Sequence, residues 1–304
     1  MGSILAFRKA ATATACAAVL GMVSPMASAA LTINTINTTV GIEATLVGAV
    51  LASGSGINVV SGSETYQGVN NANVQQSATY SGFNLAPSSG STPTLSTADG
   101  IFLTSGNANI PLTNTTNQFQ GLPGSGSNAL LSALSGNSTN DANALTFDFT
   151  VASGINAVTA KFIFGTDEFP TQSVTDIFGF FVDGVNYAKF PSGELISNTQ
   201  GNPTNFISNP VGSGLYGIEY NGLTKEFTIT AALSASLSTH TVTIAVADTS
   251  DSIFDSGVFV NSLAATTTTG GCTGIGCNNN VPEPGSLALL ALGMLGLYRS
   301  RRRA

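Results

Sequence analysis

The sequence predicts a mainly β protein, an antiparallel jelly-roll-like β-sandwich with one or two short helices. Beyond residue 144, apolar and polar residues alternate in short segments such as "ALTFDFTV" and "VTAKFIF", as in half-buried strands. Asp183 and Gly184 stand between two apolar runs and favour a tight hairpin, because this pair tolerates positive φ. Gly, Ser, Thr and Asn fill the joints between these segments, which is typical of a sandwich with many turns. A signal-peptide helix and a short hydrophobic helix are expected to flank the sandwich at its two ends.

The first half of the body contains fewer strands. A helix is expected over residues 42–51, because its apolar residues recur on one face and glycines follow at 54 and 56. Two polar stretches, 88–97 and 107–127, predict loops around the short buried strand "GIFLTSG", and residues 128–134 predict one or two helical turns. Further strands are expected in "IFGFFVDGVNYAKF", "EFTITAAL", "HTVTIAVAD" and "GVFVNSLAA".

The first 29 residues have the pattern of a secretory signal peptide. Arg8 and Lys9 precede an apolar run from about residue 10 to 23. Ala27-Ser28-Ala29 then has the small-x-small form that signal peptidase accepts. We therefore expect export and cleavage after Ala29; the alternative is an uncleaved N-terminal anchor.

The last 24 residues combine three features in a fixed order. A helix over the apolar run 286–298 would span roughly 20 Å, less than the hydrocarbon core of about 30 Å. This length predicts a marginal, transient anchor in the inner membrane, with the closing arginines on the cytoplasmic side. The residues of this segment that carry the pattern are Pro282, Glu283 and Pro284 before the run and Arg299, Arg301, Arg302 and Arg303 after it.

This arrangement resembles the PEP-CTERM sorting signal. The resemblance implies recognition by exosortase, a membrane-embedded cysteine protease of Gram-negative bacteria that removes the tail. Gly285 departs from the family, which more often has Ser or Thr there. An ordinary tail anchor is the alternative. Residues 266–280, rich in Gly, Thr and Asn, predict a flexible linker, in which Cys272 and Cys277 either form a small disulfide or stay free thiols.

The body between the two ends is strongly acidic. All sixteen acidic residues lie between positions 30 and 284, against three lysines and no arginine, which gives this part a formal charge of −13. Such a charge repels phosphate backbones and argues against nucleic acid as a partner. It favours calcium or a cation-bridged polymer instead. About 250 residues suffice for one large β domain with its own core.

The body also resembles the choice-of-anchor L domain, from about residue 39 to 265. The resemblance rests on "FIFGTDEFP", "DIFGFFVDG", "YNG" at 220–222 and "IAVADTSDSIFDSGVFV", in this order. It implies an exported bacterial surface domain and no particular chemistry. The expected organisation is a signal peptide over 1–29, the sandwich over 30–265, the linker over 266–280 and the sorting signal over 281–304.

Acidic residues gather where the predicted strands end. If two of these loops leave the same end of the sandwich, up to six carboxylates converge, and neither loop contains Lys or Arg. Calcium takes six to eight oxygen ligands, so a calcium site is one hypothesis. The alternative is that these residues only bond their own backbone in turns. The six acids are Asp167, Glu168, Asp176, Asp248, Asp251 and Asp255.

Motifs of known catalysts are missing from the sequence. It contains no G-x-S-x-G, G-x-x-x-x-G-K-[ST] or H-E-x-x-H pattern. His240, the only histidine, stands at the start of a predicted strand and is expected at the surface. Asp167 and Glu168 are adjacent and would point to opposite faces of a strand, so a glycosidase pair would need a third acid. We therefore expect no catalytic residue and no cofactor other than calcium.

The predicted function is that of a non-enzymatic, exported surface or matrix protein. Signal peptidase and exosortase would process it, and it would act in exopolysaccharide, biofilm or floc association. The rival hypothesis is a calcium-dependent carbohydrate-binding module, which needs a groove with aromatic side chains beside the metal. Only Phe169, Phe254 and Tyr220 lie near the acidic loops in sequence, and the chain has no Trp, so the rival ranks second.

Overall fold

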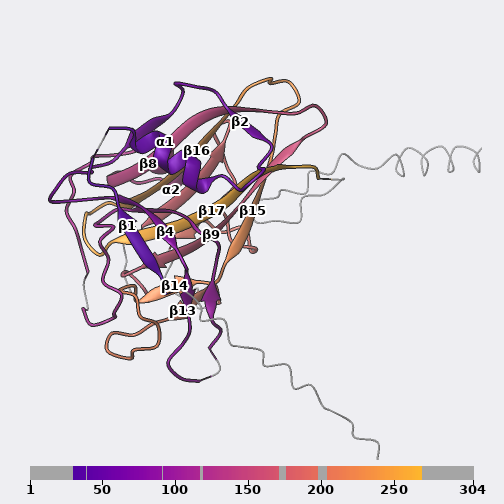
Figure 1. Cartoon of the computed structure of the whole chain (residues 1–304). Helices are drawn as coiled ribbons and strands as arrows, with labels where there is room; N and C mark the ends of the chain where they lie inside the picture. The colour runs from indigo at the N-terminus through magenta and orange to yellow at the C-terminus, as the bar shows by residue number, and fades with distance from the viewer. Residues whose placement is uncertain are drawn as a thin grey trace, which may run out of the picture.

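Two antiparallel sheets pack against each other in the computed structural model (Figure 1). The structure describes residues 30–268, apart from 39, 91, 117–118, 171–175 and 198–203. The predicted signal peptide, the sorting signal, the cysteine pair and all but the first residues of the linker lie outside these ranges. No described helix is long and apolar enough to cross a membrane. The predicted antiparallel sandwich with two short helices is confirmed.

The first sheet joins strands that are distant in sequence. Its order is β1 (Thr32–Thr35), β4 (Ser77–Ser81), β7 (Gly100–Thr104), β17 (Ser256–Thr266), β9 (Ala157–Thr166), β14 (Gly222–Thr224) and β13 (Phe206–Ser208), and β15 (Phe227–Ala232) also pairs with β9.

The second sheet faces the first. Its order is β11 (Val185–Asn186), β10 (Ile177–Val182), β16 (His240–Thr249), β8 (Thr139–Val151) and β2 (Ile57–Val59), while β12 (Ile196–Ser197) pairs with β10 and β3 (Thr65–Gln67) pairs with β8. A separate ribbon consists of β5 (Asn84–Leu85) and β6 (Leu95–Ser96), so the predicted loop over 88–97 contains a short strand.

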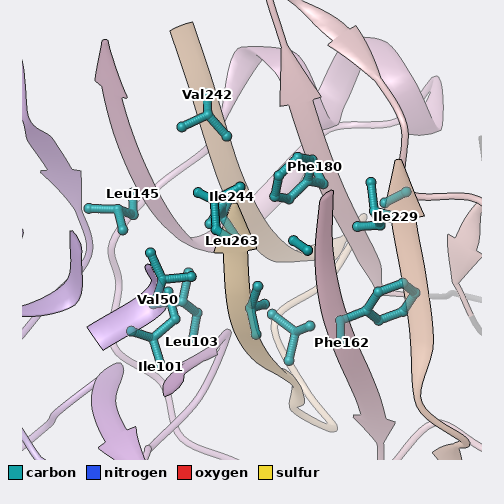
Figure 2. Packing of buried hydrophobic residues seen from close by; sticks show 14 of the residues in the cluster. Val50, Ile101, Leu103, Leu145, Phe162, Phe180, Ile229, Val242, Ile244 and Leu263 are labelled. Atoms are coloured by element: carbon teal, nitrogen blue, oxygen red, sulfur yellow. The ribbon is translucent and has the colours of Figure 1, made fainter. Parts of the chain in front are cut away.

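The main hydrophobic core lies between the two sheets. Alternate residues of each strand point inward, as period-2 side-chain geometry requires. Figure 2 shows side chains from β8, β10 and β16 of one sheet meeting those from β7, β9, β15 and β17 of the other. Helix α1 (Ile42–Val50) adds Leu46 and Val50, both fully buried, to the same core. Helix α2 (Ala129–Ser135) covers the outer face of the second sheet, where Leu131 packs with Ala245.

The predicted helix and hairpin are confirmed. The helix spans Ile42–Val50, within one residue of the expected range. Strands β10 and β11 pair Val182 with Val185, and the turn between them has φ of 50° at Asp183 and 78° at Gly184. Positive φ at both central positions is what a two-residue hairpin turn requires.

The expectation that His240 lies at the surface is wrong. Its side chain is only 4 % exposed, because the pairing of β16 with β8 places it opposite Phe149. Its Nδ1 lies 2.8 Å from Oδ2 of Asp183, and Oδ1 of the same carboxylate accepts from the backbone N–H of Thr241 (3.0 Å). His240 therefore fastens the hairpin turn to the neighbouring strand.

Candidate functional site

The inward-facing residues become polar at one end of the sandwich. Along β16, Val242, Ile244 and Val246 belong to the main core, and the next inward position is Asp248. The same change occurs on the other five strands that reach this end, so a buried polar layer closes the core there. We call this layer the polar end, and its members are Ser105, Asn143, Thr166, Asp176, Asp248 and Ser256, all fully buried.

Strand register brings two carboxylates of the polar end together. Ile177 of β10 pairs with Ala247 of β16, so the next residues, Asp176 and Asp248, face each other across the strands. Both follow the inward phase of their strands, which points them between the sheets. Among the described residues, no well-directed hydrogen bond reaches either oxygen of either carboxylate, although the Asp176 carboxyl lies near enough to Asp248 to lower the pKa of that residue. Two fully buried carboxyl groups thus sit side by side with four unsatisfied oxygens.

A third acid approaches from the loop before β17. Oδ2 of Asp255 accepts a hydrogen bond from the backbone N–H of Gly121 (2.5 Å), whereas Oδ1 has no partner in the described part of the chain. Gly106 lies against this carboxylate so closely that a Cβ there would be 1.5 Å from Oδ2. Only glycine therefore leaves room for Asp255 at this position.

Ser256 adds a buried hydroxyl to the same space. It pairs across the first sheet with Thr166, and its Oγ has no well-directed hydrogen bond within the described ranges. The hydroxyl is nevertheless near enough to Asp176 to lower the pKa of that carboxyl. Ser105, whose Oγ donates to the backbone carbonyl of Ser256 (3.3 Å), has the same effect on Asp248.

Two of the six predicted acids have another role. Oδ2 of Asp167 accepts from the backbone N–H of Phe119 (2.7 Å) and Oδ1 from that of Asn221 (3.1 Å), so this residue ties two loops to the end of β9. Asp251 is half-exposed, and its Oδ1 accepts from the backbone N–H of Ile253 (3.4 Å) within its own turn. Both residues behave as backbone acceptors in loops.

Glu168 connects the loop ends to the polar end. One of its carboxylate oxygens, Oε2, accepts from the backbone N–H of Asp176 (3.0 Å), and its side chain is almost fully buried. The structure therefore brings together Glu168, Asp176, Asp248 and Asp255, and leaves Asp167 and Asp251 at the margin.

Burial raises the pKa of these carboxyl groups. The pKa of Asp167 rises to about 7 and that of Asp255 to about 9. The pKa values of Glu168 and Asp248 rise to about 8 each. Burial raises the pKa of Asp176 well above its ordinary value, and the charges of Asp248 and Glu168 raise it further. Loss of hydration is the main cause in each case, since it disfavours the charged form.

The ion pairs of the described residues lie away from the polar end. Lys161 pairs with Glu226 at 2.8 Å, and the ammonium group of Lys225 lies 5.5 Å from the centre of the Phe227 ring. Within the described residues, no group of three or more histidine, cysteine or acidic side chains is arranged so that it could hold a metal ion. Among the residues that the structure describes, the polar end is thus an acidic layer that no ion pair neutralises.

Sequence reasoning missed Asp141 as a neighbour of this layer. Its charge raises the pKa of Asp248, and its Oδ1 accepts from the backbone N–H of Gly124 (2.6 Å). The pairing of β8 with β16 shifts its register here, and Asp141 has φ of 48°, as in a β-bulge. The bulge lies near the start of β8, which begins five residues before the segment that the sequence predicted. The sequence did contain a signal for Asn143 and Ser256 as members of the polar end. Each is the first polar residue at an inward position where the alternation of apolar residues ends.

Comparison with known proteins decides the family. A model of the choice-of-anchor L domain matches residues 32–265. The chain belongs to the choice-of-anchor L family. The matched region begins with β1 and ends at the next-to-last residue of β17, so it includes nearly the whole sandwich. It starts seven residues earlier than the sequence motifs suggested.

A second model, of the PEP-CTERM protein-sorting motif, matches residues 280–303. This choice-of-anchor L protein is therefore exported, with exosortase as its processing partner, to the cell surface or the medium. No curated protein matches the chain. No solved structure matches it either.

Proposed function

We propose that this choice-of-anchor L protein is a non-enzymatic component of the bacterial surface or extracellular matrix, where it acts in exopolysaccharide, biofilm or floc association. The observation that carries the proposal is the PEP-CTERM motif directly behind a single large sandwich. In this proposal signal peptidase removes residues 1–29, and the short apolar run holds the tail in the inner membrane of a Gram-negative cell until exosortase cuts it.

The environment of the titratable residues supports a non-enzymatic role. Asp176, Asp248 and Asp255 are fully buried, so a substrate in solution has no contact with their carboxyl groups. A hollow of about 450 Å³ between residues 151–156 and 233–240 has His240 as its only titratable lining residue. Nδ1 of that histidine is already bonded to Asp183. Neither place combines an accessible nucleophile with a base, as covalent catalysis requires.

The sorting step is tested by changing the Pro-Glu-Pro sequence. In an exosortase-bearing host, the exported protein should lack Arg299–Ala304, as measured by mass spectrometry of its C-terminus. Glu283→Ala should leave the chain uncut in the inner-membrane fraction, because the motif that precedes the apolar run is altered. Glu194→Ala, a change at an exposed acid of the body, should be exported and cut normally. An intact arginine tail on extracellular wild-type protein would contradict the proposal.

Carbohydrate binding is a second candidate, favoured by one hollow near the acids. Phe169 and Pro170 line a space of about 220 Å³ together with Asn221, whose backbone N–H donates to Asp167. The half-buried ring of Phe169 stacks on Phe206 with 5.4 Å between ring centres. A sugar there would be separated from the unsatisfied carboxylates, which are fully buried, so a lectin in which a cation bridges protein and sugar ranks second.

A further inference from the structure

We propose that the polar end binds one divalent cation, calcium, between Asp176 and Asp248, with Asp255 and Ser256 as further ligands. This inference goes beyond the matrix role proposed above and does not depend on it. The site would be structural: it would close the core where the hydrophobic layer ends and contact no solute outside the protein.

Five carboxylate oxygens of this layer have no hydrogen-bond partner among the described residues. Asp176 and Asp248 contribute two each, and Oδ1 of Asp255 is a fifth. Buried polar groups in proteins almost always have partners, so five unsatisfied carboxylate oxygens in one layer indicate that a binding partner is missing. A buried carboxylate without a counter-charge is among the most costly groups in a folded protein.

A side chain that is not acidic also faces this layer. Ser256 is a neutral residue on a different sheet, fully buried, and its Oγ also lacks a partner among the described residues. It points inward by the alternation that places Val258 and Val260 in the core, toward the side where Asp176 lies. A buried hydroxyl that lies near the Asp176 carboxylate without a well-directed hydrogen bond is what an oxygen ligand of a cation looks like when the cation is absent.

The donor atoms of the layer select the kind of cation. All six atoms are oxygens, and no histidine or cysteine lies among them, which selects a hard ion over zinc. Carboxylates that present both oxygens suit calcium, which accepts bidentate ligands and six to eight oxygens. Magnesium needs a stricter octahedron and keeps several waters, which a fully buried layer does not accommodate well. Calcium therefore fits better than magnesium.

In this structure the carboxylates do not surround a common point, because no three acidic side chains of the described residues are arranged so that they could hold a metal ion. Binding would require the side chains of Asp255 and Ser256 to turn toward the facing pair of Asp176 and Asp248. The rival occupant is a proton shared by that pair, which would remove the repulsion between them without any ion.

A melting experiment distinguishes the two occupants by sign. The exported, processed protein is heated at pH 7.5 and constant ionic strength, in chelator, in 5 mM calcium and in 5 mM magnesium. Calcium should raise the Tm by roughly 5–10 °C, because it binds only the folded state, and magnesium should raise it less. Asp176→Asn should melt above the wild type in chelator, because a buried amide stays neutral without taking up a proton, and below the wild type in calcium.

A matched control lies on the adjacent strand. Asp148 of β8 points away from the core, where its Oδ1 accepts from Oγ1 of Thr241 (2.6 Å). Asp148→Asn should keep the full calcium response. A wild-type Tm that is equal in chelator and calcium would overturn the proposal in favour of the shared proton, and so would a control that loses the response together with Asp176→Asn.

Direct binding decides the matter if the variant does not fold. Native mass spectrometry of the wild-type protein in calcium should show one ion per chain that chelator removes. A chain that carries no calcium at millimolar concentration would overturn the proposal whatever the variants do.

Discussion

The facing carboxyl groups of Asp176 and Asp248 are the most unusual residues of this protein. A single buried acid can be explained by a turn or a backbone contact, as for Asp167, which accepts two backbone hydrogen bonds. The facing pair has no such explanation within the described residues. At an effective dielectric constant of about 20, two unit charges 4 Å apart repel each other by about 4 kcal/mol. Something that carries positive charge, a proton or a cation, must therefore lie between them when the protein folds.

The raised pKa values predict how stability depends on pH without metal. The pKa values of Glu168 and Asp248 are about 8 and that of Asp255 about 9 in the folded protein, far above those of unfolded carboxyls. The folded state then binds more protons than the unfolded state between about pH 4 and 8. In chelator, the free energy of unfolding should fall as pH rises through this window.

Urea unfolding at pH 5 and pH 8 measures this effect. The midpoint should be higher at pH 5, because stability from a raised carboxyl pKa is present below the unfolded value and lost as pH approaches the folded one. Calcium should reduce the difference by stabilising the charged form at pH 8. A higher midpoint at pH 8 in chelator would show that these carboxyls are not protonated in the fold.

At the scale of elements, the polar end depends on loops that press against strand ends. The segment after β7 and the segment before β17 meet where Gly106 touches the Asp255 carboxylate. The backbone N–H of Ser105 donates to the carbonyl of Ser256 (2.9 Å), and that of Ser256 donates to Oγ of Ser105 (3.0 Å), which fixes the two segments together. The acids are therefore held by packing between elements, and each loop alone would leave them in water.

Gly106→Ala tests that packing. The new Cβ would overlap Oδ2 of Asp255, so either the carboxylate or the loop must move. We expect a loss of about 1–3 kcal/mol in the free energy of unfolding, the usual cost of overpacking, together with a weaker calcium response. Gly48→Ala is the control, because this glycine lies in α1 and a Cβ there meets nothing within 4 Å. That variant should be neutral or more stable by up to about 1 kcal/mol, and equal unfolding midpoints for the two variants would contradict the assignment.

At the scale of the whole molecule, the sandwich and its charge define what the protein can contact. Residues 30–284, which include the sandwich, carry a formal charge of −13, so an acidic polysaccharide would be repelled unless divalent cations bridge the two. Co-sedimentation of the processed protein with exopolysaccharide from its own host should therefore occur in millimolar calcium and fall with chelator.

A matched pair of proteins separates bridging from the buried site. Asp176→Asn changes only a fully buried position, so it should still co-sediment in calcium at a temperature where it is folded. Sedimentation of the wild type that is as low in calcium as in chelator would argue against a cation-bridged matrix role.

Local chemistry made much of this protein predictable from its sequence alone. Apolar alternation, the helical spacing over residues 42–51 and the Asp183-Gly184 pair act within a few residues, so α1, the hairpin of β10 and β11, and the long strands could be assigned. The short strands β1–β6 and β12–β14 carry too few residues for such a pattern and were not predicted. The sorting motif is also local, since a short segment carries it whatever the rest of the chain does. The six acids could be named because they follow strands, although their roles could not.

Only the tertiary structure decided how those acids divide. Asp167 and Asp251 became backbone acceptors, while Asp176 and Asp248 met because β10 pairs with β16 in one particular register. A shift of that register by one residue would turn an acid out of the core. His240 was misjudged for the same reason, since the strands that bury it lie far from it in sequence. Burial and pairing are set by contacts between distant segments, and these contacts leave no pattern in the residues next to the acids.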